Sequence, residues 1–327
     1  MKKLYRILSI LLAMVLLVPA FTALGEADKP LIGILQLVEH AALDDAYSGF
    51  KAGLEAQGYK DGENIVLDHR NAQGNPDMLA SIADHFIAEN VDLVLTIATP
   101  AAQTMAGKTE TIPILGTAIT DYVVARLAQS NEKPGYNVSG TTDMNDVKAQ
   151  IELMVKMVPS IKTIGLLYTA SEDNSTVQAN IAKEVIAELG LEVTEITVHN
   201  SNDVQQATQT MVGQCDAIYI PTDNVFASAM PVVYDVAVAA KIPVFCGESG
   251  MVMAGGVATW GINYYDLGYQ TAAMAIDVLF NGAKVSEMPI QAQSSYELVV
   301  NKTYCDAIGL AIPEDMLPFA KEMGAAN

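Results

Sequence analysis

Residues 31–36 read LIGILQ, and residues 163–168 read TIGLLY. Each run is apolar, is short enough to be one strand, and is followed by a longer segment with helical spacing. Gly58 and Gly190 follow the two runs at the same distance, as expected at the ends of matching helices. A strand followed by a helix is the repeating unit of a parallel sheet. The repeat therefore predicts two similar βαβ lobes.

Further matches in the same order extend this repeat through both halves of the chain. Asp92-Leu93-Val94 corresponds to Asp216-Ala217-Ile218, and Ile112-Pro113-Ile114 corresponds to Ile242-Pro243-Val244. Short apolar runs alternate with helical patterns from Pro30 onward, which is typical of α/β proteins with parallel sheets. The predicted strands are 31–36, 65–69, 93–98, 112–115, 163–168, 192–198, 217–220, 244–246, 257–260 and 297–300. The predicted helices are 42–57, 78–90, 176–189, 203–213, 225–241 and 265–281.

Three stretches that contain helix and strand breakers are predicted to connect the lobes, at residues 140–143, 255–256 and 289–294. Three crossings between lobes would form a hinge that bends about one axis. The first lobe is predicted to comprise residues 29–141 and 258–288, and the second lobe residues 142–257 and 289–327. The predicted fold class is therefore α/β, with two parallel-sheet lobes joined by a three-segment hinge.

The N-terminus has the pattern of a secretory signal peptide. A lysine pair precedes an apolar run over residues 7–18, and small residues follow through Gly25. The run is shorter than the roughly 20 residues that a membrane-spanning helix needs. Cleavage is predicted after Gly25, with Ala27 as the alternative, so residues 1–25 are assigned to the signal. We expect an exported protein, periplasmic or extracellular, that is not lipid-anchored through an N-terminal cysteine.

The charge balance excludes one large class of partners. The chain has 327 residues, with 38 acidic against 18 basic side chains and a formal net charge of −20. Such an acidic surface repels the phosphates of nucleic acids. The apolar content of 51% is enough to fill two cores. The three cysteines, Cys215, Cys246 and Cys305, leave at least one thiol unpaired, and pairing of any two stays open.

Two helix starts are candidates for binding a carboxylate. In open parallel sheets, ligands bind beyond the carboxyl ends of the strands, where helix N-termini converge. Thr99 is predicted to cap a helix that Pro100 and Ala101 begin, and Asn174 and Ser175 begin another helix in the second half. The N–H groups at these starts would suit a ligand carboxylate, although helix capping alone also explains the residues.

Acidic and polar residues follow other predicted strands. Asp223 and Glu248 stand at strand ends, where they could pair with a ligand ammonium or could lie solvated in loops. Tyr168 ends a strand that faces the predicted cleft. Further candidates for the ligand site are Gln36, Glu39, Thr120, Asp121 and Asn224. No Cys or His spacing typical of a zinc site is present, and neither a metal nor a cofactor is predicted.

No sequence motif indicates catalysis. The chain has no nucleophile elbow, no phosphate-binding loop and no dinucleotide-binding fingerprint after the first strand. We therefore predict a solute-binding protein that is not an enzyme. A sugar- or nucleoside-binding receptor of the same fold is the main alternative. A secreted enzyme would show turnover, and a transcriptional regulator would need a basic helix-turn-helix where this chain has its export pattern.

The chain resembles a known family over about residues 29–320, and six segments carry the likeness. They are Ala98-Thr99-Pro100-Ala101-Ala102-Gln103, Thr120-Asp121, Ile220-Pro221-Thr222-Asp223-Asn224, Ile242-Pro243-Val244-Phe245, Gly247-Glu248-Ser249-Gly250 and Gly261-Ile262-Asn263-Tyr264-Tyr265-Asp266-Leu267-Gly268. These segments resemble the ABC-transporter substrate-binding proteins of the tryptophan/tyrosine-binding group. The chain departs from that group at Tyr122, where Pro is frequent, and at Ser249, where a second acid is frequent.

The resemblance implies a type I periplasmic-binding fold and an extracytoplasmic location. It also implies an amino-acid ligand, commonly aromatic, in the cleft between the lobes, and a membrane-bound ABC permease as partner. We expect the receptor to be a monomer. The two departures affect the expected shape of the ligand site more than the general function.

Overall fold

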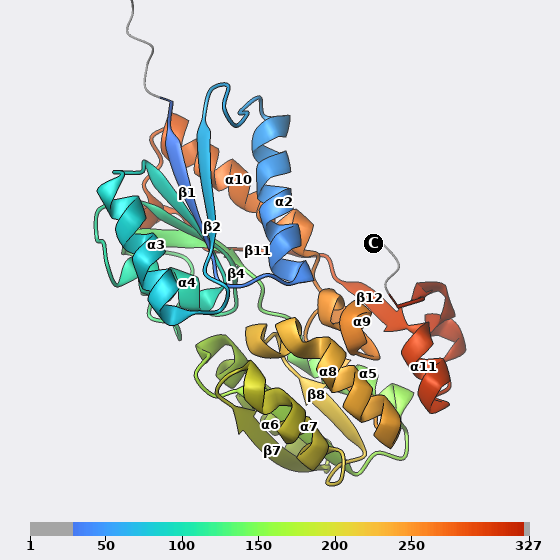
Figure 1. Ribbon diagram of the computed structural model, residues 1–327. Coiled ribbons are helices and arrows are strands. Elements are labelled where there is room, and N and C mark those ends of the chain that lie inside the picture. Colours follow the sequence, from blue (N-terminus) through green and yellow to red (C-terminus); the bar gives the residue numbers. More distant parts are fainter. Residues whose placement is uncertain (1–28, 324–327) are drawn as a thin grey trace, which may run out of the picture.

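The computed structural model describes residues 29–323 and shows two lobes, one above the other in Figure 1. The first lobe contains a six-stranded parallel sheet in the order β11-β5-β4-β3-β1-β2. Its strands are β1 (Leu31–Gln36), β2 (Val66–Asn71), β3 (Leu93–Ile97), β4 (Ile114–Ile119), β5 (Val138–Thr142) and β11 (Gln291–Ala292). Its helices are α2 (Ala41–Ala56), α3 (Pro76–Ala88), α4 (Thr99–Ala106) and α10 (Tyr264–Phe280).

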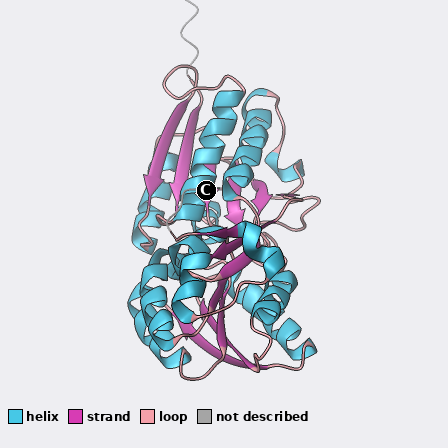
Figure 2. Ribbon diagram, turned by 90° about the vertical axis from the view of Figure 1, so that its right-hand side faces the viewer, coloured by secondary structure: helices cyan, strands magenta, loops and turns pink. Residues whose placement is uncertain are grey.

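The second lobe contains a four-stranded parallel sheet, β7-β6-β8-β9, and a separate three-stranded sheet, β10-β12-β13. The strands are β6 (Thr163–Thr169), β7 (Glu192–Val198), β8 (Ala217–Ile220), β9 (Val244–Cys246), β10 (Ala258–Gly261), β12 (Glu297–Asn301) and β13 (Ala320–Lys321). The helices are α5 (Val147–Met157), α6 (Asp173–Glu188), α7 (Val204–Met211), α8 (Asn224–Ala240), α9 (Ser249–Gly255) and α11 (Lys302–Ile308). Helices lie on both sides of the strands in each lobe (Figure 2).

Each lobe has its own hydrophobic core, which explains the continuous apolar strands. Ile32 and Ile34 in the first lobe, and Leu166 and Ile218 in the second, are fully buried. A parallel sheet covered by helices on both faces buries successive side chains of its inner strands, so those strands show no polar alternation, whereas the edge strands β2 and β7 are more exposed. The predicted α/β fold with two parallel-sheet lobes is confirmed.

Several elements differ from the sequence-based prediction. β5 lies where a connecting stretch was expected, and α5 and α9 had no predicted counterpart. The sequence of β5, VSGTT, is polar enough to suggest a loop, but the strand is buried between β4 and β11. β4 begins at Ile114 and runs to Ile119, further along the chain than the predicted strand over 112–115.

The chain passes between the lobes three times, at residues 143–146, 262–263 and 293–296. β10 pairs with β12 and its Ala258 lies in the core of the second lobe, so residues 258–261 are not in the first lobe as expected. The Gly255-Gly256 pair ends α9 instead of crossing between lobes. β11 pairs with β5 and therefore extends the sheet of the first lobe, to which it had not been assigned.

Helices α2 and α10 pack side by side with their backbones in close contact (Figure 1). A Cβ added at Gly49 would overlap the carbonyl oxygen of Tyr265, and a Cβ added at Gly268 would overlap that of Ala46. Glycine at these positions lets the two helices approach more closely than any other residue would allow. Because both helices begin at the boundary between the lobes, this packing fixes the relative positions of their first residues.

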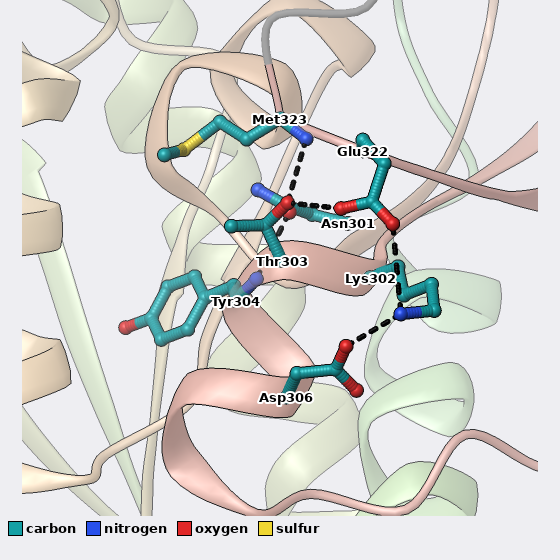
Figure 3. Close-up of polar contacts among 7 residues, drawn as sticks. All are labelled: Asn301, Lys302, Thr303, Tyr304, Asp306, Glu322 and Met323. Carbon is teal, nitrogen blue, oxygen red and sulfur yellow. Dashed lines mark hydrogen bonds and ion pairs between the residues drawn. The ribbon is translucent and has the colours of Figure 1, made fainter.

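The C-terminal strand β13 is held against the start of α11 by polar contacts (Figure 3). Thr303 Oγ1 donates to Glu322 at 2.7 Å and accepts a hydrogen bond from Met323 N at 2.9 Å. Lys302 Nζ lies 3.5 Å from the Glu322 carboxylate and 2.5 Å from that of Asp306. Exposed ion pairs of this kind contribute at most about 1 kcal/mol each, so they position β13 more than they stabilise the lobe.

The predicted signal peptide lies outside the described residues. Within residues 29–323, no helix has the length and apolar character needed to cross a membrane. The three cysteines are unpaired: Cys246 and Cys305 are buried, and Cys215 is partly buried.

Candidate functional site

A small cavity, with only about 10 Å³ of free volume, lies between the two lobes, at the carboxyl ends of strands from both sheets. The first lobe contributes His40, Leu43, Ala118, Thr120 and Tyr264 to its lining. The second lobe contributes Asn174, Thr222, Asp223, Asn224, Ala227 and Glu248, and the first crossing contributes Asp143. The cavity is therefore built from residues that only the approach of the two lobes brings together.

Asp143 connects the first crossing to the first lobe. Its side chain is 2% exposed, and its carboxylate accepts hydrogen bonds from Thr120 Oγ1 at 2.8 Å and from Tyr264 OH at 2.7 Å. Burial raises the pKa of this carboxyl, and the two hydroxyl donors partly oppose that shift. Thr120 was among the predicted site residues, whereas Asp143 and Tyr264 were not. Asp143 directly follows β5, and an acid at the end of a strand would have indicated a site residue. Because β5 was not predicted, this position was not recognised as a strand end.

Asp223 is the residue that caps the N-terminus of α8 and is 1% exposed, so it is not a solvated loop carboxylate. Its Oδ1 accepts hydrogen bonds from Phe226 N and from Thr169 Oγ1, each at 2.9 Å. Its Oδ2 accepts from Thr169 N at 2.6 Å. The carboxylate thus caps one helix and ties it to the end of β6. Because Asp223 also lines the cavity, its carboxylate can accept a hydrogen bond from a ligand as well.

Glu248 caps the N-terminus of α9 in the same way and is also 1% exposed, so it is not solvated either. Its carboxylate accepts hydrogen bonds from Met251 N, at 2.8 Å, and from Gly250 N. Burial raises the pKa of Glu248 to about 7, because the backbone donors only partly compensate for lost hydration. The negative charges of Asp45 and Asp143 raise the pKa of Glu248 further.

Glu172 is a further buried acid beside the cavity, and the sequence analysis did not select it. Its Oε2 accepts hydrogen bonds from Asn174 Nδ2 at 2.9 Å and from Asn224 Nδ2 at 2.7 Å. Burial and the nearby Asp223 carboxylate raise the pKa of Glu172 to about 7. The residue precedes α6 in the sequence, where helix capping would explain an acid, but its side chain does not cap α6.

Helices α4 and α6 begin at the boundary between the lobes without a side-chain cap. The prediction that Thr99 caps α4 is wrong, because Ala98 precedes the helix with a φ of 86° and Thr99 is its first residue. Thr99 Oγ1 is buried without a hydrogen-bond partner. Gln103 Nε2 of α4 donates to the Asp173 carboxylate at the start of α6 at 2.8 Å. Two helix starts with free N–H groups therefore lie near each other across the boundary.

The structure brings five of the predicted residues together around the cavity: Thr120, Asn174, Asp223, Asn224 and Glu248. Thr99, Pro100, Ala101 and Ser175 lie at the starts of α4 and α6, outside its lining. The other predicted residues also lie outside the lining: Gln36, Glu39, Asp121 and Tyr168. Gln36 is hydrogen-bonded to His69 inside the first lobe, Glu39 is exposed, and Asp121 caps its own turn. Tyr168 OH donates to Glu195 on the neighbouring strand β7, so its hydroxyl is engaged within the second lobe.

No group of three or more His, Cys, Asp or Glu side chains in the described part of the chain is arranged to hold a metal ion. The buried carboxyl groups instead accept hydrogen bonds from hydroxyl, amide and backbone N–H donors. The cavity can therefore receive a ligand that brings its own positive charge or hydrogen-bond donors.

Comparison with known proteins gives consistent matches over nearly the whole described chain. The sequence profile of a family described as ABC transporter substrate binding protein matches residues 31–323. A tyrosine-binding protein of Clostridioides difficile (strain R20291) is 42% identical over 279 residues, which make up 85% of this chain and 81% of that protein.

Two solved structures superpose on nearly the whole of this chain. An ABC domain in complex with L-Trp from Streptococcus pneumonia superposes with a TM-score of 0.86 at 37% identity, over 90% of this chain and 99% of that chain. A ligand-free, open structure of a substrate-binding protein with adhesive properties from Clostridium difficile has the same coverage and 44% identity, but a TM-score of 0.69. The structure with the more similar sequence therefore superposes less well on this chain than the L-Trp complex does. The chain belongs to the family of ABC transporter substrate-binding proteins.

Proposed function

We propose that this protein is the extracytoplasmic receptor of an ABC importer and that it binds an aromatic amino acid, tyrosine or tryptophan, between its lobes. It delivers the ligand to the permease and catalyses no reaction. The tyrosine-binding relative and the L-Trp complex support this ligand class. We expect the receptor to act as a monomer.

The acidic character of the cavity is the observation that carries the proposal. Asp143, Asp223 and Glu248 line it, and no Lys or Arg is among the lining residues that the structure describes. A buried carboxylate without a cationic partner is unfavourable because it has lost its hydration. The α-ammonium group of an amino acid would supply the missing positive charge and up to three N–H donors.

The other parts of an amino acid have candidate partners as well. The uncapped starts of α4 and α6 offer backbone N–H groups and a partial positive charge for the carboxylate. Leu43, Ala227 and Tyr264 give the cavity an apolar side against which an aromatic ring could pack. Burying a ring of about 150–250 Å² at about 25 cal/mol per Å² would contribute roughly 4–6 kcal/mol.

The same charges explain how a ligand would close the lobes. Without a cation, closing brings Asp143 from the crossing toward Glu248 of the second lobe, and each carboxylate raises the free energy of the other. An ammonium group removes that cost, so the ligand binds the closed state more tightly than the open state. A ligand shifts a conformational equilibrium only by this difference in affinity. The permease would then recognise the closed form.

Titration calorimetry of the protein without its signal segment tests the proposed ligand. L-Tyrosine or L-tryptophan should bind with a Kd at or below about 1 μM, which corresponds to about −8 kcal/mol. myo-Inositol and uridine serve as probes for the alternative sugar or nucleoside receptor. Binding of either of these in place of both amino acids would overturn the proposed ligand class.

The affinity for the amino acid should fall below neutral pH. The pKa of Glu248 is raised to about 7 from a usual value of 4.5, so the ligand-free closed site holds a proton there in acid. The ammonium group must displace that proton, and binding should weaken up to about tenfold per pH unit below pH 7. Calorimetry at pH 8.0 and pH 5.5 measures this change. An equal Kd at both values would show that no carboxyl group in the site titrates with binding.

The same pKa shift predicts the opposite trend for the ligand-free protein. A carboxyl with a raised pKa in the folded state binds its proton more tightly there than in the unfolded chain. Its contribution to stability is therefore present below pH 4.5 and is lost as the pH rises to about 7. The ligand-induced gain in melting temperature should accordingly be larger at pH 8.0 than at pH 5.5.

A further inference from the structure

His40 lies at the cavity between the lobes and was not selected by any sequence pattern. It precedes α2 in the first lobe but makes no side-chain cap to that helix. Its Nε2 lies 3.2 Å from Oδ1 of Asn224, the first residue of α8 in the second lobe. Both residues line the cavity. The contact therefore exists only while the lobes are together.

The orientation of the Asn224 amide is fixed by Glu172. Asn224 Nδ2 lies 2.7 Å from Glu172 Oε2, and the backbone N of Asn224 lies 3.2 Å from the same oxygen. Turning the amide over would place its carbonyl oxygen against the carboxylate oxygen, which would set two acceptors together. Oδ1 therefore faces His40, and an amide oxygen can only accept a hydrogen bond.

This orientation determines which nitrogen of His40 carries the hydrogen. Nε2 must donate to Asn224 Oδ1, so Nε2 is protonated. Burial lowers the pKa of His40 to about 4, which keeps the ring neutral at physiological pH. In a neutral imidazole, the other nitrogen has a lone pair and accepts. His40 Nδ1 is thus an acceptor, and it is buried without a partner.

Other hydrogen-bond acceptors line the same cavity. The lining includes the carboxylates of Asp143, Asp223 and Glu248, and Asn174 Oδ1 is also buried without a partner. Asn174 Nδ2 donates to Glu172, so its Oδ1 is an acceptor by the same reasoning. A buried acceptor without a donor costs about 1–3 kcal/mol. The group that enters the cavity must therefore bring hydrogen-bond donors.

We propose that His40 Nδ1 accepts a hydrogen bond from the α-ammonium group of the bound amino acid, and that Asn224 and Glu172 hold the imidazole in the tautomer that this requires. This inference rests on the proposed function and assigns a positioning chain to its site. Opening the lobes breaks the contact between His40 and Asn224, so the acceptor is set only in the closed state. The chain thus ties recognition of the ammonium group to closure.

The alternative is that His40 only bridges the lobes through Nε2. Two substitutions separate the two roles because asparagine and glutamine replace different ring nitrogens. In His40→Asn the side-chain oxygen takes the place of Nδ1, while the bond to Asn224 is lost. In His40→Gln the amide nitrogen takes the place of Nε2, while the acceptor at Nδ1 is lost. His199→Asn is a matched control, because His199 is exposed and is not in the cavity lining.

Calorimetry with L-tyrosine or L-tryptophan, whichever the wild type binds, measures the difference. We expect H40Q to bind at least about tenfold more weakly than wild type, and H40N to bind more tightly than H40Q. H199N should match wild type. For a desamino analogue, 3-(4-hydroxyphenyl)propionate or indole-3-propionate, wild type and H40Q should bind equally, since no ammonium group is present. Equal or tighter binding by H40Q than by H40N would overturn the role of Nδ1.

Nitrogen NMR of the imidazole rings gives an independent readout in the ligand-bound protein. The chain has 4 histidines, and the spectrum of H40N identifies the signals of His40 by their absence. We expect the neutral tautomer with hydrogen on Nε2 at pH 7. Hydrogen on Nδ1, or a charged ring, would overturn the inference even where the amino acid binds. If wild type binds no aromatic amino acid, the proposed function fails first, and this inference falls with it.

Discussion

Asp143→Asn is expected to weaken binding of the aromatic amino acid about 10- to 100-fold. The substitution keeps the size of the side chain and one carbonyl oxygen, but it removes the negative charge. Asp143 is 2% exposed, so water screens its interaction with an ammonium group very little. A hydrogen bond to a charged group contributes about 1.5–3 kcal/mol, and about 1.4 kcal/mol corresponds to a factor of ten in Kd. Calorimetry at pH 8.0 provides the measurement.

A matched control separates this effect from the loss of one surface charge. Asp235→Asn changes the net charge equally, but Asp235 is exposed and lies about 16 Å along α8 from the cavity end of that helix. It should bind the ligand as wild type does. The ligand-free melting temperature of D143N should not fall, because burial already disfavours the charged carboxyl. If D143N bound the amino acid within about twofold of wild type, Asp143 would have no part in recognising the ammonium group.

Gly268→Ala is expected to destabilise the first lobe by about 2–3 kcal/mol. An added Cβ would overlap the carbonyl oxygen of Ala46 and would lie 2.9 Å from Phe50 N, both on the facing helix. These are backbone atoms, so no side-chain rotation relieves the overlap and α2 must move away from α10. Overpacking of this kind typically costs about 1–3 kcal/mol, and larger shifts cost more. The helical preference of alanine over glycine returns only about 0.5–1 kcal/mol.

Urea unfolding followed by circular dichroism measures this difference in free energy. Gly213→Ala serves as the control, because its added Cβ would meet only Thr210 O, at an ordinary contact distance of 3.8 Å. That variant should remain within about 1 kcal/mol of wild type. Since α2 begins beside His40 and α10 begins at Tyr264, G268A should also weaken ligand binding. A G268A protein as stable as G213A would show that the two helices can separate at little cost.

The sequence predicted more of the fold than of the site. Each of the ten predicted strands overlaps a strand of the structure. Apolar runs such as residues 31–36 and 163–168 are recognisable because a strand buried on both faces has a continuous apolar sequence. β5 was missed because its VSGTT sequence is polar, although the strand is buried. The second crossing between lobes was misplaced because Gly255-Gly256 ends a helix, and a glycine pair alone does not distinguish a helix end from a hinge.

Among the predicted site residues, those at the ends of β4, β8 and β9 reached the cavity. Thr120, Asp223 and Glu248 did so because the carboxyl ends of parallel strands meet at one edge of each sheet. Tyr168 ends a strand of the same sheet but contacts Glu195 on the neighbouring strand. The strand-end rule locates a backbone position and does not determine the direction of the side chain.

The sequence by itself determined that this chain forms two related α/β lobes, because apolar spacing and glycine positions act over a few residues and recur in both halves. Only the tertiary structure decided which polar groups share the space between them. His40 and Asn224 are 184 positions apart, and nothing near either residue specifies the other. Whether a carboxyl group such as Glu172 is solvated or buried, and so how it titrates, depends on what the fold packs against it.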